Sequence, residues 1–364
     1  MVAFDELNKY YFFIDNDQYE GLFSFLKNRQ DKIKKAKLIK INDNDFLEYA
    51  EKINNDFDFP TAYSFKYFGL YAPKNHNGDI LEFKDLAKLN YNENDELSYP
   101  LLAVMRLDVD NLGSIFEFGL GDRCTFSRIA SLSREMDMFF SGYFNELARK
   151  FDVYITYSGG DDAFVIGSWY NILYFAKELY RKFKEFVCNN EYLTFSAGIF
   201  MCHENYPVAK FAQKTADLEE LSKGFKDDNG KAKNAVTVFD HTLSWDSYCT
   251  MLDFADKLLS YTNQDEVKDK EKLSRSLVHR LLRIIKSCLN KNGSVNTDKL
   301  YRNVAQLHYL FARHGFDANR IVKAQEGITK DIITVILQEF SKEKIVKNYL
   351  IPTNYVILKT RKIL

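Results

Sequence analysis

The sequence has 364 residues, of which 46% are hydrophobic and 28% charged, and its formal net charge is −1. This composition is typical of a globular protein with two or three domains, and it excludes a chain that attracts nucleic acid through bulk positive charge. The five cysteines lack C-x-x-C spacing, which excludes a zinc knuckle. With no signal-peptide pattern and no apolar run of about eighteen residues, the sequence predicts a cytoplasmic protein with no membrane partner.

The first 95 residues are rich in charged and aromatic side chains. A short β-rich run predicts a strand over residues 36–41, and a periodic stretch predicts a helix over residues 45–53. Residues 90–98 are polar and acidic, which is typical of a domain boundary. We therefore predict a small α/β linker region over residues 1–95.

The middle of the chain alternates β-rich runs with segments of helical periodicity. The predicted elements, in order, are a strand at 101–107, a helix at 126–150, strands at 153–157 and 163–167, a helix at 169–187, a strand at 192–202, a helix from 207 to about 223, and a strand at 235–239. This order predicts an α+β fold whose core is a ferredoxin-like palm of the nucleotidyl-cyclase (GGDEF-like) type, over residues 96–245. Such a palm brings the end of the first strand close to the tip of the following hairpin.

Residues 246–364 have apolar side chains at intervals of three and four, which predicts an all-α C-terminal bundle. Within this segment, residues 301–364 contain eleven Lys or Arg against five Asp or Glu. Two interpretations stay open for this basic tail: a solvated helical face, or a surface that docks RNA or another protein.

Two acidic motifs predict the chemistry of the palm. Asp108 and Asp110 end the buried strand and point to one side if the strand continues. The hairpin tip reads Ser158, Gly159, Gly160, Asp161, Asp162. Glycines suit a tight turn, and they leave the backbone open to a nucleotide. A buried carboxylate is costly unless it is paired or binds a metal ion.

These acids predict a magnesium platform. Mg²⁺ prefers a few carboxylates together with substrate phosphates, and two such ions can activate a hydroxyl and steady a leaving group. Asp108, Asp161 and Asp162 are the predicted ligands, with the carbonyl of Val109 as a further oxygen, and Mn²⁺ is an alternative ion. Lysines supply charge for phosphates, so the positions that follow the palm helix and precede the last strand are further candidates. They are Lys223 and Lys233.

The motifs at residues 108–113, 157–162 and 233–239 resemble those of the large subunit of type III CRISPR effector complexes, with the subtype A form most similar. The resemblance covers residues 65–364, as the second palm and the C-terminal helical domain. It implies a nucleotidyltransferase that joins ATP molecules into cyclic oligoadenylates when its complex binds target RNA, as part of antiviral defence.

Carried over residue by residue, the resemblance implies that Asp108, Asp161 and Asp162 bind the metal ions. It places Ser158, Gly159, Gly160 and Asn111 near the nucleotide and directs Lys223 and Lys233 at its phosphates. The implied partners are ATP, guide and target RNA through the complex, and other type III subunits. These subunits include a partner palm or N-terminal half, because this chain lacks the His-Asp nuclease dipeptide and the zinc module of full-length members.

Two other functions stay open. One is a stand-alone cyclic-dinucleotide synthase such as a diguanylate cyclase, although its hairpin usually carries Glu and then Phe where this chain has Asp161, Asp162, Ala163 and Phe164. The other is a scaffold subunit without catalysis, against which the intact acids argue. Preference for GTP over ATP would favour the first, and absence of Mg²⁺-dependent ATP binding would favour the second.

Overall fold

The chain folds into two compact units, Met1–Phe68 and Gly69–Leu364, which are described separately. The computed structural model describes residues 2–4, 9–11, 19–28, 30–42, 45, 47–89, 98–119, 121, 124–227, 230–262, 274–290, 294–313 and 346–361. The predicted boundary at residues 90–98 lies largely outside these ranges. The division after Phe68 differs from the predicted one after residue 95, because Leu70 and Tyr71 form hydrogen bonds with the palm that follows.

The first unit is built from two small sheets and two helices. Its elements are β1 (Val2–Phe4), β2 (Lys9–Tyr11), α1 (Tyr19–Lys27), a 3-10 turn (Gln30–Lys32), β3 (Ala36–Ile41), α2 (Leu47–Asp56) and β4 (Thr61–Lys66). β1 pairs with β2 antiparallel, and β3 pairs with β4 in parallel. The strand predicted at 36–41 is confirmed, and the predicted helix begins two residues later than expected.

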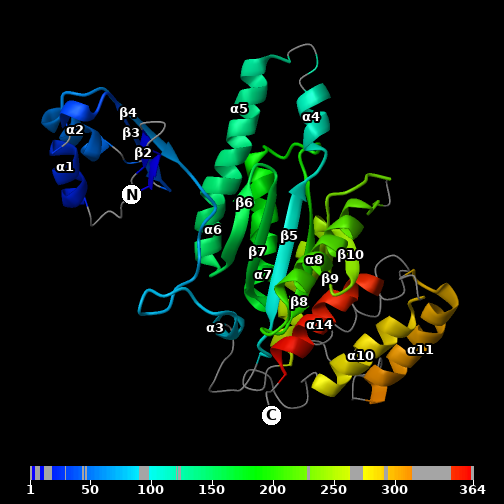
Figure 1. Ribbon diagram of the computed structural model, residues 1–364. Helices are drawn as coiled ribbons and strands as arrows, with labels where there is room; N and C mark the ends of the chain where they lie inside the picture. The colour runs from blue at the N-terminus through cyan, green and yellow to red at the C-terminus, as the bar shows by residue number, and fades with distance from the viewer. Residues whose placement is uncertain are drawn as a thin grey trace, which may run out of the picture. The chain divides into compact units, whose positions relative to one another are not determined.

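The second unit contains a six-stranded sheet in the order β10-β9-β8-β5-β7-β6. Its elements are α3 (Phe83–Lys88), β5 (Leu102–Val109), α4 (Leu112–Phe118), α5 (Phe126–Asp137), a π-helix (Met138–Tyr143), α6 (Phe144–Lys150), β6 (Tyr154–Gly159), β7 (Asp162–Ser168), α7 (Trp169–Phe186), β8 (Phe195–Cys202), α8 (Val208–Lys223), β9 (Ala235–Val238) and β10 (His241–Ser244). The four strands β8-β5-β7-β6 follow the ferredoxin-like order, which confirms the predicted α+β palm. Figure 1 shows β5 inside this sheet, beside β7 and β8.

β5 has apolar side chains on both faces for most of its length, as a central strand should. Met105 and Leu107 point into the larger core, which lies against α5, α6, α7 and the C-terminal helices. Leu102 and Val104 point to the opposite face, into the smaller core beneath α3 and α8. Since side chains alternate along a strand, the later polar residues of this second set face α8.

Three features of the palm were not predicted. The long helix at 126–150 contains a π-helical stretch over Met138–Tyr143, and a further strand, β10, pairs antiparallel with β9. A short helix, α4, also follows β5 directly. Wide π turns commonly occur where a helix must adapt to a functional neighbour.

The segment that precedes the palm covers its outer strand. Asn145 on α6 accepts hydrogen bonds from the backbone N–H groups of Leu70 (3.0 Å) and Tyr71 (3.1 Å). The N–H of Ile155 on β6 donates to the carbonyl of Tyr71 at 2.9 Å. Gly69 lies so close to the hairpin that an added Cβ would stand 2.6 Å from the Cβ of Ser158, so a glycine is required there.

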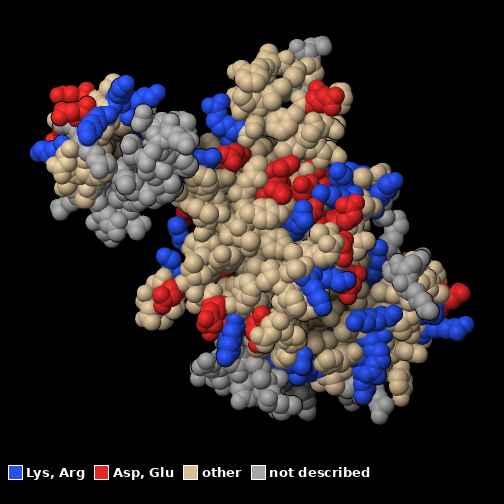
Figure 2. Space-filling view, in the orientation of Figure 1, with Lys and Arg blue, Asp and Glu red and all other residues tan. Residues whose placement is uncertain are grey.

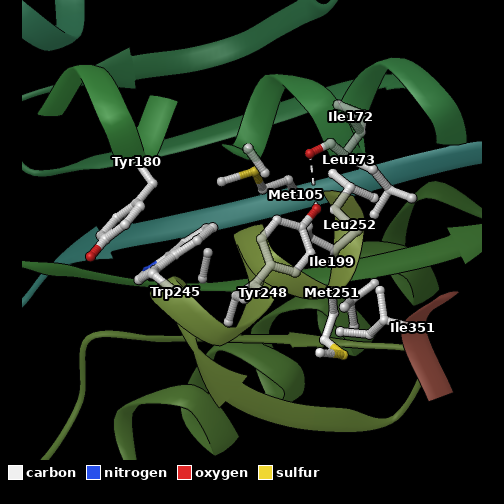
Figure 3. Packing of buried hydrophobic residues seen from close by; sticks show 14 of the residues in the cluster. Met105, Ile172, Leu173, Tyr180, Ile199, Trp245, Tyr248, Met251, Leu252 and Ile351 are labelled. Carbon is white, nitrogen blue, oxygen red and sulfur yellow. Dashed lines mark hydrogen bonds between the residues drawn. The ribbon is translucent and has the colours of Figure 1, made fainter. Parts of the chain in front are cut away.

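The C-terminal helices pack against the palm through an aromatic core. They are α9 (Trp245–Ser260), α10 (Arg275–Ser287), α11 (Thr297–Arg313) and α14 (Leu350–Lys359), preceded by a 3-10 turn (Val346–Tyr349). Trp245 and Tyr248 are fully buried near Met105 and Ile199 of the sheet, and the hydroxyl of Tyr248 donates to the carbonyl of Leu173 at 2.9 Å (Figure 3). The predicted helical region is therefore confirmed for its described residues, although it shares one compact unit with the palm.

Pro352 lies in the first turn of α14, where its missing N–H costs no helical hydrogen bond. Among the described residues, no helix is both long enough and apolar enough to cross a membrane.

Candidate active site

The three predicted acids meet at one end of the sheet. Asp108 on β5 pairs directly with Asp162 on β7 in the antiparallel register, so their side chains lie on the same face. The N–H of Val109 donates to the carbonyl of Asp161 at 2.9 Å, which fixes the hairpin tip against the end of β5. Figure 2 shows acidic side chains gathered with basic ones around this end of the sheet. The prediction that strand end and hairpin would meet is confirmed.

The electrostatics of Asp162 reflect this crowding. Burial raises the pKa of its carboxyl group, and the negative charges of Asp161 and then Asp108 raise it further. Arg106 and a hydrogen bond with Tyr157 act in the opposite direction without cancelling the shift. Like charges held this close repel each other, and a cation between them would relieve the repulsion.

Lys223, at the end of α8, supplies one cation. Its ammonium nitrogen lies 3.0 Å from Asp108 Oδ2 and 2.6 Å from Glu219 Oε1. Burial by itself lowers the pKa of Lys223, but the hydrogen bonds to Glu219 and Asp108 outweigh it and leave the pKa raised. Lys223 therefore lies beside the acids and forms an ion pair with Asp108, whereas its predicted role at the phosphates stays a prediction.

Glu219 is the member of this group that the sequence analysis missed. Its side chain is only 5% exposed and lies between two cations, Lys223 and Arg106, whose Nε is 2.7 Å from Glu219 Oε2. Gly198 on β8 makes this possible, because an added Cβ would stand 2.5 Å from the N of Glu219 and 2.6 Å from the carbonyl of Thr215. The detectable signal was the spacing of four residues between Glu219 and Lys223 on one helix.

Asp110 behaves differently from Asp108, although the two were expected to point to the same side. β5 ends at Val109, and Asp110 is buried at 1% exposure. Its carboxylate accepts hydrogen bonds from Thr194 Oγ1 (2.8 Å), Ser196 Oγ (2.8 Å) and the backbone N–H of Asn234 (3.0 Å). Burial raises the pKa of Asp110 in spite of these donors. These three protein donors tie the end of β5 to the start of β8 and to the segment before β9, so Asp110 acts as a structural anchor.

This anchor holds a second predicted pair together. Lys233 Nζ donates to Asn111 Oδ1 at 2.7 Å. Both residues have positive φ, 69° for Lys233 and 57° for Asn111, as does Asn234 with 50°. Since non-glycine residues rarely adopt this conformation, the Asp110 hydrogen bond to Asn234 helps to fix it. Asn111 and Lys233 therefore lie side by side, and their side chains bond to each other.

The hairpin glycines have separate roles. Gly160 has a φ of 67° and open space where a side chain would be, whereas Gly159 belongs to β6 and pairs with Asp162. Only Gly160 therefore needs the positive φ that was expected of both. The hydroxyl of Ser158 donates to the carbonyl of Phe140 in the π-helix at 2.6 Å, so this side chain ties the hairpin to the helix.

The carboxylates at the end of β5 and at the hairpin tip suit a hard divalent cation, because carboxylate oxygens are the ligands that Mg²⁺ prefers. Among the described residues, however, no group of three His, Cys, Asp or Glu side chains is arranged to hold a metal ion. Asp108 is instead held by Lys223. The residues fit the predicted ion in kind, and Lys223 bonds to Asp108 through Oδ2.

Comparison with known sequences locates the same region. Residues 101–237 match the profile described as Cas10/Cmr2, second palm domain. The chain is 34% identical over 243 residues to a CRISPR system single-strand-specific deoxyribonuclease Cas10/Csm1 (subtype III-A) of Streptococcus thermophilus, covering 64% of this chain and 29% of that protein. A relative of the same description from Mycobacterium tuberculosis is 39% identical over 166 residues, covering 40% and 20%. The chain thus spans less than a third of the length of these relatives.

Solved structures support the fold. Csm1 of T. onnurineus aligns with a TM-score of 0.59 and 21% identity, covering 82% of this chain and 42% of that one. A Csm1–Csm4 cassette described in complex with one ATP aligns with a TM-score of 0.57 and 20% identity, covering 84% of this chain and 42% of that one. At these identities the likeness shows a shared fold.

Proposed function

We propose, from the premise that residues 101–237 are a second palm domain of the Cas10/Cmr2 family, that this palm binds ATP with Mg²⁺ and contributes to synthesis of cyclic oligoadenylates. The observation that carries the proposal is the meeting of Asp108, Asp161 and Asp162 at the glycine hairpin. The descriptions of similar folds as complexes with ATP and with cA3 support the choice of nucleotide and product.

In the proposed reaction, a 3′-hydroxyl attacks the α-phosphate of a second ATP, the new phosphodiester bond forms, and pyrophosphate leaves. Asp108, Asp161 and Asp162 would hold the divalent ion, which supplies charge neutralisation and a more acidic hydroxyl when bound. Gly160 leaves room for the nucleotide at the turn. Lys223, which lies 3.0 Å from Asp108 Oδ2, would supply positive charge for the phosphates.

The proposal also includes a partner palm or a separate N-terminal half, because the chain covers 42% of the Csm1 chain that it resembles. We propose that the other subunits, guide RNA and target RNA belong to the same assembly. The chain by itself is then expected to bind nucleotide and to make little product.

The test uses the assembled complex with target RNA, ATP and Mg²⁺, and identifies products by mass spectrometry. The double variant Asp161→Ala/Asp162→Ala should lose product to below detection, because the two hairpin acids supply most of the metal ligands. A matched control, Asp217→Ala/Glu220→Ala, removes two exposed acids from α8 and should make product as the unmodified chain does.

Two outcomes would overturn the proposal. Undiminished product from the hairpin variant would show that the reaction does not need Asp161 and Asp162. Preference for GTP over ATP would point to a cyclic-dinucleotide synthase. Calorimetry can also measure the affinity for ATP with and without Mg²⁺. A scaffold subunit would bind ATP equally weakly under the two conditions, whereas the proposed enzyme would bind ATP more tightly with Mg²⁺.

A further inference from the structure

Glu219 on α8 is a buried carboxylate whose two oxygens lie against two different cations. Its Oε1 is 2.6 Å from Lys223 Nζ, and its Oε2 is 2.7 Å from Arg106 Nε. The Nε of Arg106 has no hydrogen-bond partner among the described residues, so this second contact is an attraction between charges. Buried ion pairs are weak evidence for stability, because apolar side chains of similar volume often serve as well. The arrangement around Glu219 therefore points to another role.

The fold brings Glu219 to this place through one glycine. Arg106 on β5 and Gly198 on β8 are directly paired, so the two residues lie on the same face of the sheet. Because Gly198 has no side chain, α8 approaches until the backbone N of Glu219 would stand 2.5 Å from an added Cβ. Side chains alternate along β5, so Asp108 lies on this face as well. Glu219 is therefore inserted beside the row of side chains that ends in the predicted metal ligands.

The two cations connect Glu219 with both strands of the acid cluster. On β5, Lys223 contacts Asp108 Oδ2 at 3.0 Å. On β7, burial raises the pKa of the Asp162 carboxyl group, and the positive charge of Arg106 acts in the opposite direction. Each cation therefore interacts both with Glu219 and with one of the predicted metal ligands.

The charges of this group do not cancel. The carboxylates of Glu219 and of the three predicted metal ligands carry four negative charges at neutral pH, whereas Lys223 and Arg106 carry two positive ones. The difference is two negative charges, which one divalent ion neutralises. Asp110 and Lys233 lie nearby, but they bear opposite charges and leave the difference unchanged. Without Glu219 the excess would be a single charge, and the two cations would be drawn to the metal ligands instead.

We propose that Glu219 is a positioning residue, which draws Lys223 and Arg106 toward itself and so leaves the acid cluster with two uncompensated negative charges for one divalent ion. The inference rests on the proposed function, because the ion is the one that the three acids would hold. Glu219 acts on this ion through the two cations. A purely structural role, in which Glu219 only ties α8 to β5, makes a different prediction, because the charge of Lys223 would then not matter.

The test measures the affinity of the full chain for Mn²⁺ alone, without nucleotide, from the electron paramagnetic resonance signal of the free ion. Glu219→Gln keeps the size of the side chain and removes its charge. It should weaken Mn²⁺ binding roughly tenfold, because a dication responds strongly to one charge in a partly buried site. Glu220→Gln is the matched control, since it makes the same change at the next position of α8, where the side chain is exposed. It should bind Mn²⁺ like the unmodified chain, because exposed charges are screened by solvent and salt.

A second pair of variants separates the effect of charge from a structural role. Lys223→Gln removes a positive charge and should bind Mn²⁺ more tightly than the unmodified chain. Glu219→Gln/Lys223→Gln restores the excess of two negative charges and should recover the affinity of the unmodified chain to within about threefold. If Glu219 only ties α8 to β5, the double variant stays as weak as Glu219→Gln. Circular dichroism checks that each variant stays folded.

Three results would overturn the inference. They are an unchanged Mn²⁺ affinity in Glu219→Gln, no recovery in the double variant, and no Mn²⁺ binding by the unmodified chain. The variant Asp161→Ala/Asp162→Ala tests the proposed function separately, because it should lose Mn²⁺ binding with Glu219 in place. Loss in this hairpin variant together with normal binding by Glu219→Gln would reject only the role of Glu219. Normal Mn²⁺ binding by the hairpin variant would instead reject the acids as ligands of the ion.

Discussion

Asp108 and Asp110, at the end of β5, carry the same carboxyl group but differ in their surroundings and in their roles. Asp108 is 30% exposed at its side chain, faces two other acids and is held by a single lysine. Asp110, two residues later, is buried and accepts hydrogen bonds from two hydroxyls and a backbone N–H. A buried carboxylate that several protein donors hold in place serves to fix the chain, whereas one beside other acids gains from a cation.

Removing the anchor should have the largest effect on stability. Asp110→Ala leaves Thr194, Ser196 and the N–H of Asn234 without their acceptor, which we expect to lower the free energy of unfolding by about 3 kcal/mol. Urea unfolding measures it. Asp161→Ala at the hairpin tip is the control and should change stability by less than about 0.5 kcal/mol. Equal effects of the two variants would erase the distinction between anchor and site.

The second prediction concerns a variant that should shift α8 without changing any charged side chain. Gly198→Ala places a Cβ 2.5 Å from the N of Glu219, so the helix must shift, and we expect a loss of about 2 kcal/mol from overpacking. Gly113→Ala is the control, because its Cβ meets open space in α4, and it should raise stability by about 0.5–1 kcal/mol. Thermal unfolding of both variants tests the pair. A neutral Gly198→Ala would mean that α8 does not depend on this close approach.

The smallest effect on stability is expected at the site itself. Asp108→Asn weakens a half-exposed ion pair with Lys223, so the free energy of unfolding should change by less than about 1 kcal/mol. The same variant should lose Mg²⁺-stimulated ATP binding in calorimetry. A large loss of stability with normal ATP binding would show that Asp108 is an anchor like Asp110, and the comparison would then fail.

The sequence was informative where periodicity and turn residues determine structure. The order of palm strands, the Gly160 turn and the meeting of Asp108 with the hairpin acids all followed from local patterns. Patterns could not show that the chain leaves the strand at Asp110, because a positive φ at Asn111 decides it. They also missed Glu219, whose role depends on how closely α8 approaches Gly198 across the sheet. No sequence pattern predicted the π-helix. The carbonyl of Phe140 within it accepts a hydrogen bond from Ser158, which lies 18 positions away in the sequence.

The strap formed by residues 69–71 has a consequence for how this palm behaves before and during assembly. An outer strand with free N–H and C=O groups is a template for accidental pairing with other chains. Here Asn145 captures the strap, and the strap occupies the outer side of β6 through Tyr71 and Ile155. The chain's own backbone thus covers part of the outer edge of β6, at Ile155 and beside Ser158, and leaves less of that edge open to pairing with another chain.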